Sequence, residues 1–321
     1  MIGEFLQKER YALTFGESMG LLRQTTPGRL ATQHTLGFGF GGAESNVAIG
    51  LARLGASVAW CGRLGDDGVG ELIERELRAE GVRVLAARDT EAPTGLMLKE
   101  RPTSGTSRVL YYRRAGSGSR LAPADVPPGL VEDAALVHLT GITSALSESA
   151  SATVDSVIDR AKAAGVAVSI DLNYRSALWT SADAAPHFAR LLARADIAFA
   201  GDDEAAIVLG PGSAEELARG LRALGPTEAI IKLGERGCYA DVGEETLGRG
   251  AVPITAVDTV GAGDAFVAGY LAEWLANAPL AQRLDTAVAA GAFACLTEGD
   301  WEGLPRRRDF ALLAAGDPVR R

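Results

Sequence analysis

The sequence predicts an α/β fold in which helices flank a mostly parallel sheet in three layers, with a small β-sheet lid beside it. Short β-rich runs alternate with alanine- and leucine-rich stretches along most of the chain, which is the pattern of successive β-α-β units. Two separate regions break this alternation with strand-like sequence. Glycine is also plentiful, at 39 of 321 residues, which indicates many tight turns and sites where the backbone approaches a ligand.

The elements of the main sheet are expected from residue 11 onward. In the first part of the chain, strands are predicted at 11–15 and 58–61, and helices at 44–54 and 69–80, each closed by a glycine. Farther along, strands are predicted at 136–139, 166–172, 197–200 and 229–232, and helices at 147–164 and 213–224. Buried strands that alternate with helices predict a parallel sheet covered on both faces.

The lid is expected from residues 21–40 and 94–114. These regions lack a helical period and contain alternating runs such as TGLMLKE and RVLYYRR, so each is expected to form a hairpin or a pair of strands. A turn is predicted at 102–105 in the second region. No repeat or long linker separates two folds, so 1–321 is expected to be a single domain that carries this lid.

The composition excludes several classes of protein. A hydrophobic content of 47% with 23% charged residues excludes a disordered chain. The net charge of −9 argues against a nucleic-acid partner, because proteins that bind phosphate backbones present basic surfaces. The N-terminus lacks the apolar core of a signal peptide, and no apolar run approaches the ~20 residues of a membrane span. With three scattered cysteines expected to be reduced, the sequence predicts a cytoplasmic protein that has no membrane partner.

The strongest local signal is DTVGAGD at 258–264, followed by the helical run AFVAGYLAEWL. A strand-like segment at 252–257 leads into the glycines, and a helix follows them. This order places successive backbone N–H groups and the positive end of a helix at one point, which predicts an anion site. Asp264 alone could simply cap the helix, but the full string with its upstream aspartate is more specific.

This string resembles the C-terminal signature of the ribokinase (PfkB) family of carbohydrate kinases. GGAESNVAIGLARLG at 41–55, followed by GRLGDDGVGELIERELRAEGV, resembles the N-terminal signature of that family, and the similarity spans essentially the whole chain. The resemblance implies a ribokinase-like fold and Mg²⁺-assisted phosphoryl transfer from ATP. It also implies that Gly261, Ala262 and Gly263 supply N–H groups to the phosphoryl group, and that Asp264 takes the proton of the acceptor hydroxyl. The chain contains neither a P-loop nor the HRD and DFG motifs of protein kinases.

The nucleotide side of the site is expected around 232–238 (KLGERGC), which resembles the strand-turn segment of the family near ATP. The resemblance implies that Lys232, Gly234 and Gly237 bind the nucleotide together with Gly261 and Gly263; an ordinary glycine hairpin is the alternative for this segment. The Asn-x-x-Glu motif of the family is matched at 201–204 by GDDE, with glycine in the place of asparagine. Glu204 is implied to hold magnesium through water.

The acceptor is expected to be a sugar acid, because three segments resemble those of 2-keto-3-deoxygluconate kinases within the family. These segments are VLYYRRAGSGSRLAPADV, LTGITSAL and DLNYRSALW. The resemblance implies six substrate-binding residues: Gly42, Asn46, Tyr111, Arg113, Arg175 and Asp300. The planar fork of arginine suits a carboxylate, whereas a neutral sugar needs no cation. Without the resemblance, Arg113 and Arg114 would be interpreted as solvated charges on an edge strand.

Several alternatives stay open. Met97 stands where the family often has a tyrosine, so a neighbouring sugar acid or the C4 epimer, the galactonate form, remains an alternative acceptor. Fructokinase, ribokinase or 5-dehydro-2-deoxygluconokinase activity is the alternative function. The chain lacks GxGxxG after its first strand, which argues against a dehydrogenase, and an intact Asp264 argues against a non-catalytic sugar-binding regulator. The lid leaves four apolar residues in need of a partner surface (Leu96, Leu98, Val109 and Tyr111), which predicts a homo-oligomer formed through the lid.

Overall fold

The computed structural model describes residues 10–103 and 106–313 and contains one large sheet. Its strands are β1 (Ala12–Phe15), β4 (Val58–Gly65), β5 (Arg83–Asp89), β8 (Leu136–Thr140), β9 (Ala167–Asp171), β10 (Ile197–Gly201), β11 (Glu228–Lys232), β12 (Cys238–Asp241) and β13 (Thr246–Arg249). In this part of the chain they form a nine-stranded sheet in the order β13-β12-β11-β10-β9-β8-β1-β4-β5. All neighbouring strands pair in parallel except β11–β12 and β12–β13, which pair antiparallel. The expected mostly parallel sheet is confirmed.

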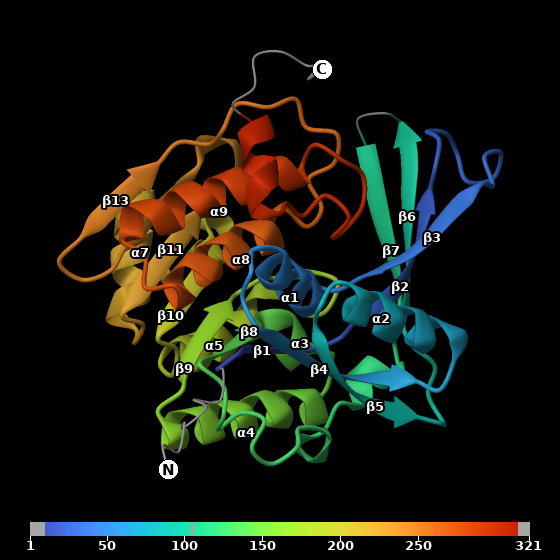
Figure 1. Ribbon diagram of the computed structural model, residues 1–321, viewed down its shortest axis with the longest axis horizontal. Coiled ribbons are helices and arrows are strands. Elements are labelled where there is room, and N and C mark those ends of the chain that lie inside the picture. Colours follow the sequence, from blue (N-terminus) through green and yellow to red (C-terminus); the bar gives the residue numbers. More distant parts are fainter. Residues whose placement is uncertain (1–9, 104–105, 314–321) are drawn as a thin grey trace, which may run out of the picture.

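Helices cover both faces of this sheet (Figure 1). One face packs on α1 (Ala43–Arg53), α2 (Gly68–Ala79), α8 (Ala262–Leu275) and α9 (Leu280–Ala294), and the other packs on α4 (Glu148–Ala164), α5 (Ser181–Leu192), α6 (Asp202–Leu209) and α7 (Ala214–Ala223). Alternate strand residues feed the two cores, so that Trp60 lies in the first and Cys61 in the second. Short helical segments complete the described chain: α3 (Gly141–Leu146), η1 (Ser117–Arg120), η2 (Pro123–Asp125), η3 (Gly234–Arg236) and η4 (Arg307–Leu312). The three-layer arrangement is confirmed.

A separate four-stranded sheet, which we call the lid, stands beside the main sheet (Figure 1). Its strands are β2 (Met19–Gln24), β3 (Leu36–Gly41), β6 (Leu96–Thr103) and β7 (Thr106–Tyr112), and they come from both predicted regions. β2–β3 and β6–β7 pair antiparallel, whereas β2–β6 pair in parallel. The second half of the predicted turn at 102–105 lies outside the described residues.

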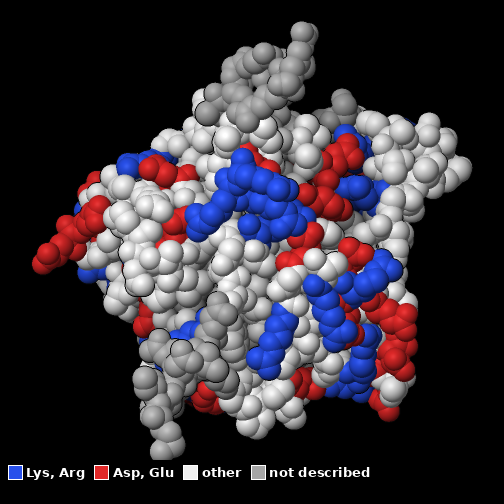
Figure 2. Space-filling model, in the orientation of Figure 1, with Lys and Arg blue, Asp and Glu red and all other residues white. Residues whose placement is uncertain are grey.

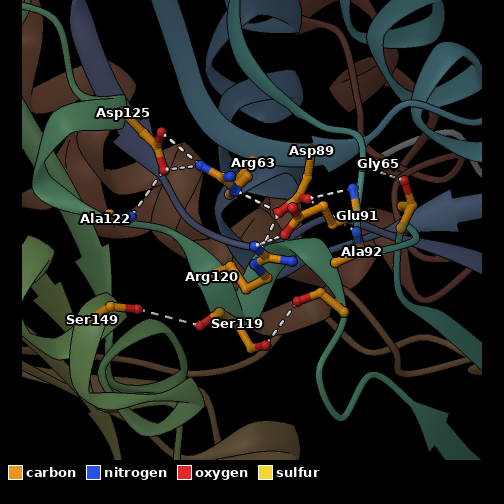
Figure 3. Close-up of polar contacts among 12 residues, drawn as sticks. Arg63, Gly65, Asp89, Glu91, Ala92, Ser119, Arg120, Ala122, Asp125 and Ser149 are labelled. Atoms are coloured by element: carbon orange, nitrogen blue, oxygen red, sulfur yellow. Dashed lines mark hydrogen bonds and ion pairs between the residues drawn. The ribbon is translucent and has the colours of Figure 1, made fainter.

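Three ion pairs lie where the segment that leaves the lid meets the edge of the main sheet (Figure 3). The Arg63 guanidinium donates to Asp89 at 2.8 Å and to Asp125 at 3.0 Å. Arg120 lies 3.2 Å from the same Asp89 carboxylate. Although burial raises the pKa of Asp89, the Arg63 guanidinium and the N–H groups of Glu91 and Ala92 lower it to about 2. Because Arg120 and Asp125 make these contacts, the chain that follows Arg113 is anchored to the main sheet.

One predicted strand is wrong. Residues 252–257 form no strand, and the segment runs as irregular chain between β13 and α8. Pro253 lacks the N–H that a sheet ladder needs, and the segment contributes Val252, Ile254 and Ala256 to the wall of a cavity instead. The short apolar run therefore serves a cavity wall rather than a strand.

The molecular surface mixes charges of both signs. On the face shown in Figure 2, basic side chains lie beside acidic ones. Among the surface ion pairs of the described residues, Arg219 lies 2.7 Å from Glu215 and Arg249 lies 2.7 Å from Asp285. Among the helices in the described ranges, none has both the length and the apolar character to cross a membrane.

Candidate active site

A cavity of about 420 Å³ lies between the lid and the carboxyl ends of the main-sheet strands. It is lined by eleven of the residues that the sequence predicted for the site: Gly42, Asn46, Tyr111, Arg113, Arg175, Glu204, Lys232, Gly261, Gly263, Asp264 and Asp300. This is the edge where ligands of open α/β sheets bind, because polar side chains and helix N-termini converge there. The structure therefore brings together residues that lie more than 200 positions apart in the sequence, such as Gly42 and Asp300.

The turn before α8 forms the floor of this cavity. Gly261 has φ +77°, and a Cβ at this position would overlap the backbone carbonyl oxygen of Asp300. The turn therefore requires glycine for both its conformation and its close packing. The N–H of Ala262 donates to the Thr259 carbonyl at 3.3 Å, whereas within the described residues the N–H groups of Gly261 and Gly263 meet no protein acceptor. Two of the three predicted donors are thus free for a ligand.

Asp264 is buried in the first turn of α8, where its carboxylate accepts a hydrogen bond from Asn46 Nδ2 at 2.8 Å. Burial raises the pKa of Asp264 to about 7, against the opposing effects of the Asn46 hydrogen bond and the Arg175 charge. Burial likewise raises the pKa of Asp300 to about 7, and the nearby Asp264 charge raises it further. A carboxylate with a pKa near neutrality suits a general base, since it can both hold and release a proton at physiological pH.

A second cavity of about 580 Å³ opens on the other side of the same turn. It shares Lys232, Thr259 and Gly263 with the first cavity. Its polar end lies at the turn, and most of its remaining wall is apolar: Ala251, Val252, Pro253, Ile254, Ala256, Phe266, Val288, Ala292 and Cys295. An elongated ligand with an anionic end and a flat apolar end fits this division. Ala262 faces this cavity rather than the first.

The predicted nucleotide segment borders the second cavity. Gly234 and Gly237 line it with φ values of +58° and +92° in the hairpin between β11 and β12. A Cβ at Gly237 would overlap the Arg249 carbonyl oxygen, so this glycine is required by the hairpin itself. Residues 232–238 therefore form the glycine hairpin that the sequence offered as the alternative, and this hairpin lies at the wall of the second cavity.

The Lys232 ammonium stands on the wall between the two cavities. It donates to the two Asp171 carboxylate oxygens at 2.7 and 2.6 Å and lies 4.0 Å from Glu204. Although burial lowers the pKa of Lys232, Asp171 and Glu204 raise it overall, so the ammonium remains charged. Glu204 itself accepts the N–H groups of Gly201 at 2.7 Å and Tyr174 at 2.9 Å. A fixed cation at this point suits a phosphate group that passes from one cavity to the other.

A metal ion would have few protein ligands here. Among the described residues no group of three or more histidine, cysteine or acidic side chains could hold one. Glu204 lines the first cavity close to Lys232, with its carboxylate already accepting two backbone N–H groups. This donor set fits a magnesium ion that takes most of its ligands from phosphates and water, with Glu204 in its outer sphere.

The two predicted arginines differ in their surroundings. Arg113, with 11% of its side chain exposed, pairs with the buried carboxylate of Glu17, and its guanidinium lies 5.4 Å from the centroid of the Tyr111 ring. The interpretation of Arg113 as a solvated edge charge is therefore wrong. Arg175 is exposed and lines the same cavity, and within residues 10–103 and 106–313 its one hydrogen-bond acceptor is the Tyr174 carbonyl at 3.2 Å. Arg175 is the less neutralised of the two cations.

Five charged or amide residues of the cavity lining were not predicted as site residues: Glu17, Glu44, Lys99, Asp171 and Asn173. Asp171 lies at the end of the strand predicted at 166–172 and Asn173 directly follows it, so their position at a strand end was a usable signal. Asn173 has φ +42°, a conformation that asparagine tolerates better than most residues. Glu44 is buried and accepts the hydroxyls of Thr140 and Thr143 at 2.7 and 2.6 Å, a set of contacts that no local pattern reveals.

Comparison with known proteins identifies the family. The model of the pfkB family carbohydrate kinases matches residues 9–307, and the chain belongs to this family. A 2-dehydro-3-deoxygluconokinase of Bacillus subtilis is 37% identical over 305 residues, which cover 94% of each chain. A 2-dehydro-3-deoxygalactonokinase of Haloferax volcanii is 34% identical over 95% of this chain and 97% of that protein.

Solved structures share the fold. The crystal structure of a 2-dehydro-3-deoxygluconokinase from Thermotoga maritima superposes with a TM-score of 0.88 at 25% identity, over 95% of this chain and 100% of that one. A putative ribokinase II from E. coli, solved in complex with ATP and Mg²⁺, superposes with a TM-score of 0.87 at 22% identity, over 95% and 99% of the two chains. The ribokinase-like fold that the sequence predicted is confirmed.

Proposed function

We propose that this protein transfers the γ-phosphoryl group of ATP to the 6-hydroxyl of 2-keto-3-deoxygluconate, which is also called 2-dehydro-3-deoxygluconate. The products are ADP and 2-keto-3-deoxy-6-phosphogluconate. The observation that carries the proposal is the meeting of two cavities at one turn, with the buried Asp264 carboxylate on the acceptor side. The likeness to a 2-dehydro-3-deoxygluconokinase supports this choice of acceptor. Because ATP is an intracellular substrate, we place the reaction in the cytoplasm.

The residues of the turn act on the two reactants from opposite sides. Asp264 accepts the proton of the acceptor hydroxyl. The hydroxyl oxygen bonds to the γ-phosphorus, and the bond between that phosphorus and ADP breaks. The free N–H groups of Gly261 and Gly263 donate hydrogen bonds to the phosphoryl group and stabilise its negative charge. The Lys232 ammonium adds a full positive charge between the cavities. Glu204 would hold a magnesium ion bound with the nucleotide through water, and that ion would supply neutralisation of the phosphate charge.

The acceptor cavity suits a deoxy sugar acid. Arg175 offers a cation for the carboxylate, and Asn46, Asp264 and Asp300 offer hydrogen-bonding groups for hydroxyls. The lid contributes an apolar group to the same cavity, made of Met19, Leu21, Met97 and Val109. A methylene such as C3 of the substrate can lie against this group at no loss of hydrogen bonds. A hydroxyl in the same place would be buried without a hydrogen-bond partner, at a cost of roughly 1–3 kcal/mol.

The galactonate epimer is the second candidate acceptor. Met97 is buried on the inner face of the lid and offers only a thioether, which is a weak hydrogen-bond acceptor. The Haloferax relative that is named a 2-dehydro-3-deoxygalactonokinase is nearly as similar to this chain as the Bacillus one. A coupled assay of ADP release should therefore include both epimers, with fructose, ribose and 5-dehydro-2-deoxygluconate as the competing acceptors.

Arg175→Ala tests the sugar-acid proposal, because Arg175 is exposed and lines the cavity. Its charge also lowers the pKa of Asp264, so the informative quantity is the difference between carboxylate and neutral acceptors. A charge-assisted hydrogen bond contributes about 1.5–3 kcal/mol, so kcat/KM for the sugar acid should fall ~10–150-fold. Arg113→Ala should cause a similar loss, with an added loss of stability from the unpaired Glu17 carboxylate. Neutral sugars should be poor acceptors, and their use should fall less.

Arg114→Ala is the matched control, since Arg114 is exposed and lies outside the cavity lining. It should leave kcat/KM unchanged. Faster phosphorylation of ribose or fructose than of either sugar acid by the wild type would refute the choice of acceptor. Unchanged kcat/KM for the sugar acid in both Arg113→Ala and Arg175→Ala would refute it equally.

We also propose that the protein forms a dimer through the lid. Phe38 and Tyr112 on lid strands β3 and β7 are 53% and 63% exposed, which is costly for aromatic side chains on a small sheet. Two of the four residues that the sequence analysis offered for this contact, Val109 and Tyr111, line the acceptor cavity instead. Phe38 and Tyr112 are the better candidates for the interface.

Light scattering at micromolar concentration should therefore give twice the chain mass of 33.4 kDa. Phe38→Glu with Tyr112→Glu should shift the protein to a monomer, because charges desolvated in an interface are unfavourable. Leu209→Glu, at an exposed position on α6, is the control and should leave the mass unchanged. A monomeric wild type would disprove the proposal.

A further inference from the structure

Cations of the lid pair with carboxylates of the main body at three positions. Lys99 pairs with Asp258, Arg101 pairs with Glu298, and Arg23 lies 3.7 Å from Glu302. Figure 1 shows the corresponding segments side by side, with the lid strands next to the chain that follows α9. Of these three cations, Lys99 is the one that lines the acceptor cavity.

Lys99 is an unusual residue for its place in β6. Its side chain is 2% exposed, and its neighbours Met97 and Leu98 are buried and apolar. A buried ion pair contributes little net stability, because desolvation of the two charges offsets their attraction. An apolar side chain would serve packing equally well here, so the charge calls for an explanation other than stability.

The partner carboxylate supplies that explanation. Asp258 accepts the N–H of Val260 at 3.2 Å through one oxygen and the N–H of Gly299 at 3.3 Å through the other, and this second oxygen also receives the Lys99 ammonium. Asp258 thus ties the turn that leads into Gly261 to the loop that carries Asp300. The two segments touch again where the Gly261 backbone packs against the Asp300 carbonyl.

We propose that Lys99 is a positioning residue that couples the closed lid to phosphoryl transfer by holding Asp258, and through it the turn at 258–261 and the loop at 299–300. The proposal rests on the kinase function proposed above. With the ammonium in place, the Gly261 and Gly263 N–H groups and Asp264 keep their geometry while an acceptor is covered. Without it, Asp258 loses its lid partner and the turn is free to shift.

The test compares Lys99→Met, which keeps the length of the side chain and removes its charge, with Asp258→Asn and with the double variant. A misplacement of about 1 Å in a catalytic group can cost ~10²-fold in rate, so kcat of Lys99→Met should fall roughly 10–100-fold. The KM values for acceptor and ATP should change much less. Because Lys99 acts through Asp258, the double variant should be no slower than the slower single variant. The double variant leaves no unpaired buried charge, so it reports even where a single variant folds poorly.

Arg101→Gln is the matched control, since it removes a neighbouring ion pair between lid and body from outside the cavity lining. Its kcat should stay within about twofold of the wild type, because a partly exposed pair contributes little. An equal fall in kcat for Arg101→Gln would overturn the proposal in favour of general attachment of the lid. A rise in acceptor KM with unchanged kcat in Lys99→Met, or strictly additive losses in the double variant, would overturn it as well.

All rates are measured with whichever acceptor the wild type phosphorylates fastest. A wild type that prefers a neutral sugar refutes the proposed acceptor and leaves this test intact. A loss of kcat/KM in Lys99→Met that is confined to carboxylate acceptors would instead make Lys99 a direct ligand of the substrate and would refute its role through Asp258.

Discussion

Asp264→Asn is expected to lower kcat by roughly 10²–10⁴ while nucleotide affinity stays nearly constant. The amide cannot accept the proton of the acceptor hydroxyl, but its carbonyl oxygen can still accept the hydrogen bond from Asn46 that the carboxylate accepts at 2.8 Å. The fold of the turn should therefore survive the change. Steady-state kinetics with the preferred acceptor, together with the Kd for ATP, separate the loss of the base from a loss of binding.

The pH profile gives a second readout of the same residue. Burial raises the pKa of Asp264 to about 7, so kcat/KM of the wild type should rise with pH through this region as the carboxylate ionises. The residual activity of Asp264→Asn should lack that rise. Because Asp300 also titrates at about 7 beside it, the apparent pKa belongs to the pair. Near-normal turnover in Asp264→Asn would contradict the assignment of the base.

The raised pKa of Asp264 also predicts how stability depends on pH: the free energy of unfolding should fall as pH rises, whereas kcat/KM should increase. A carboxyl whose folded pKa lies above its unfolded value binds its proton more tightly in the native state. Its contribution to the free energy of unfolding is complete below the unfolded pKa of about 4 and is lost as pH rises through about 7. The free energy of unfolding of Asp264→Asn minus that of the wild type should therefore be larger at pH 8 than at pH 5.

Local patterns sufficed for much of the fold and for the centre of the site. The β-α alternation predicted the parallel sheet, and the turn at 258–264 followed by an apolar helix predicted an anion site with Asp264 at the helix start. These features depend on neighbours in sequence, on which propensity and helix dipoles act directly. The segment at 252–257 shows the limit of such patterns, because a short apolar run cannot be told from a cavity wall without its surroundings.

Contacts between distant segments escaped prediction for a different reason. The pairing of Arg113 with Glu17 joins two segments far apart in sequence, and it decides how much positive charge remains for a substrate. Lys99 reads as an ordinary charged residue of an alternating strand, and only its burial beside Asp258 distinguishes it. Such pairs depend on how the lid packs on the main body. Hydrophobic periodicity reports only on neighbours in sequence, so it cannot predict these pairs.

Gly261→Ala is expected to abolish most activity and to destabilise the fold. The left-handed conformation, with φ +77°, costs alanine roughly 1–2 kcal/mol, and the added Cβ would overlap the Asp300 carbonyl oxygen. Relief of that overlap must move either the turn or the loop of Asp300, and both line the acceptor cavity. Loss of one well-aimed N–H donor at a developing charge costs about 10²–10³ in kcat, so a loss of at least this size should appear.

Gly250→Ala provides the control for this substitution. Gly250 lies in the same irregular stretch before α8, and a Cβ there would meet no atom within 4 Å. Its free energy of unfolding in urea and its kcat should both match the wild type. Gly261→Ala should show a lower free energy of unfolding and a lower kcat in the same measurements. If Gly261→Ala kept its kcat, the turn would not supply the phosphoryl group with its N–H groups, because the substitution cannot be accommodated without displacing the backbone that carries them.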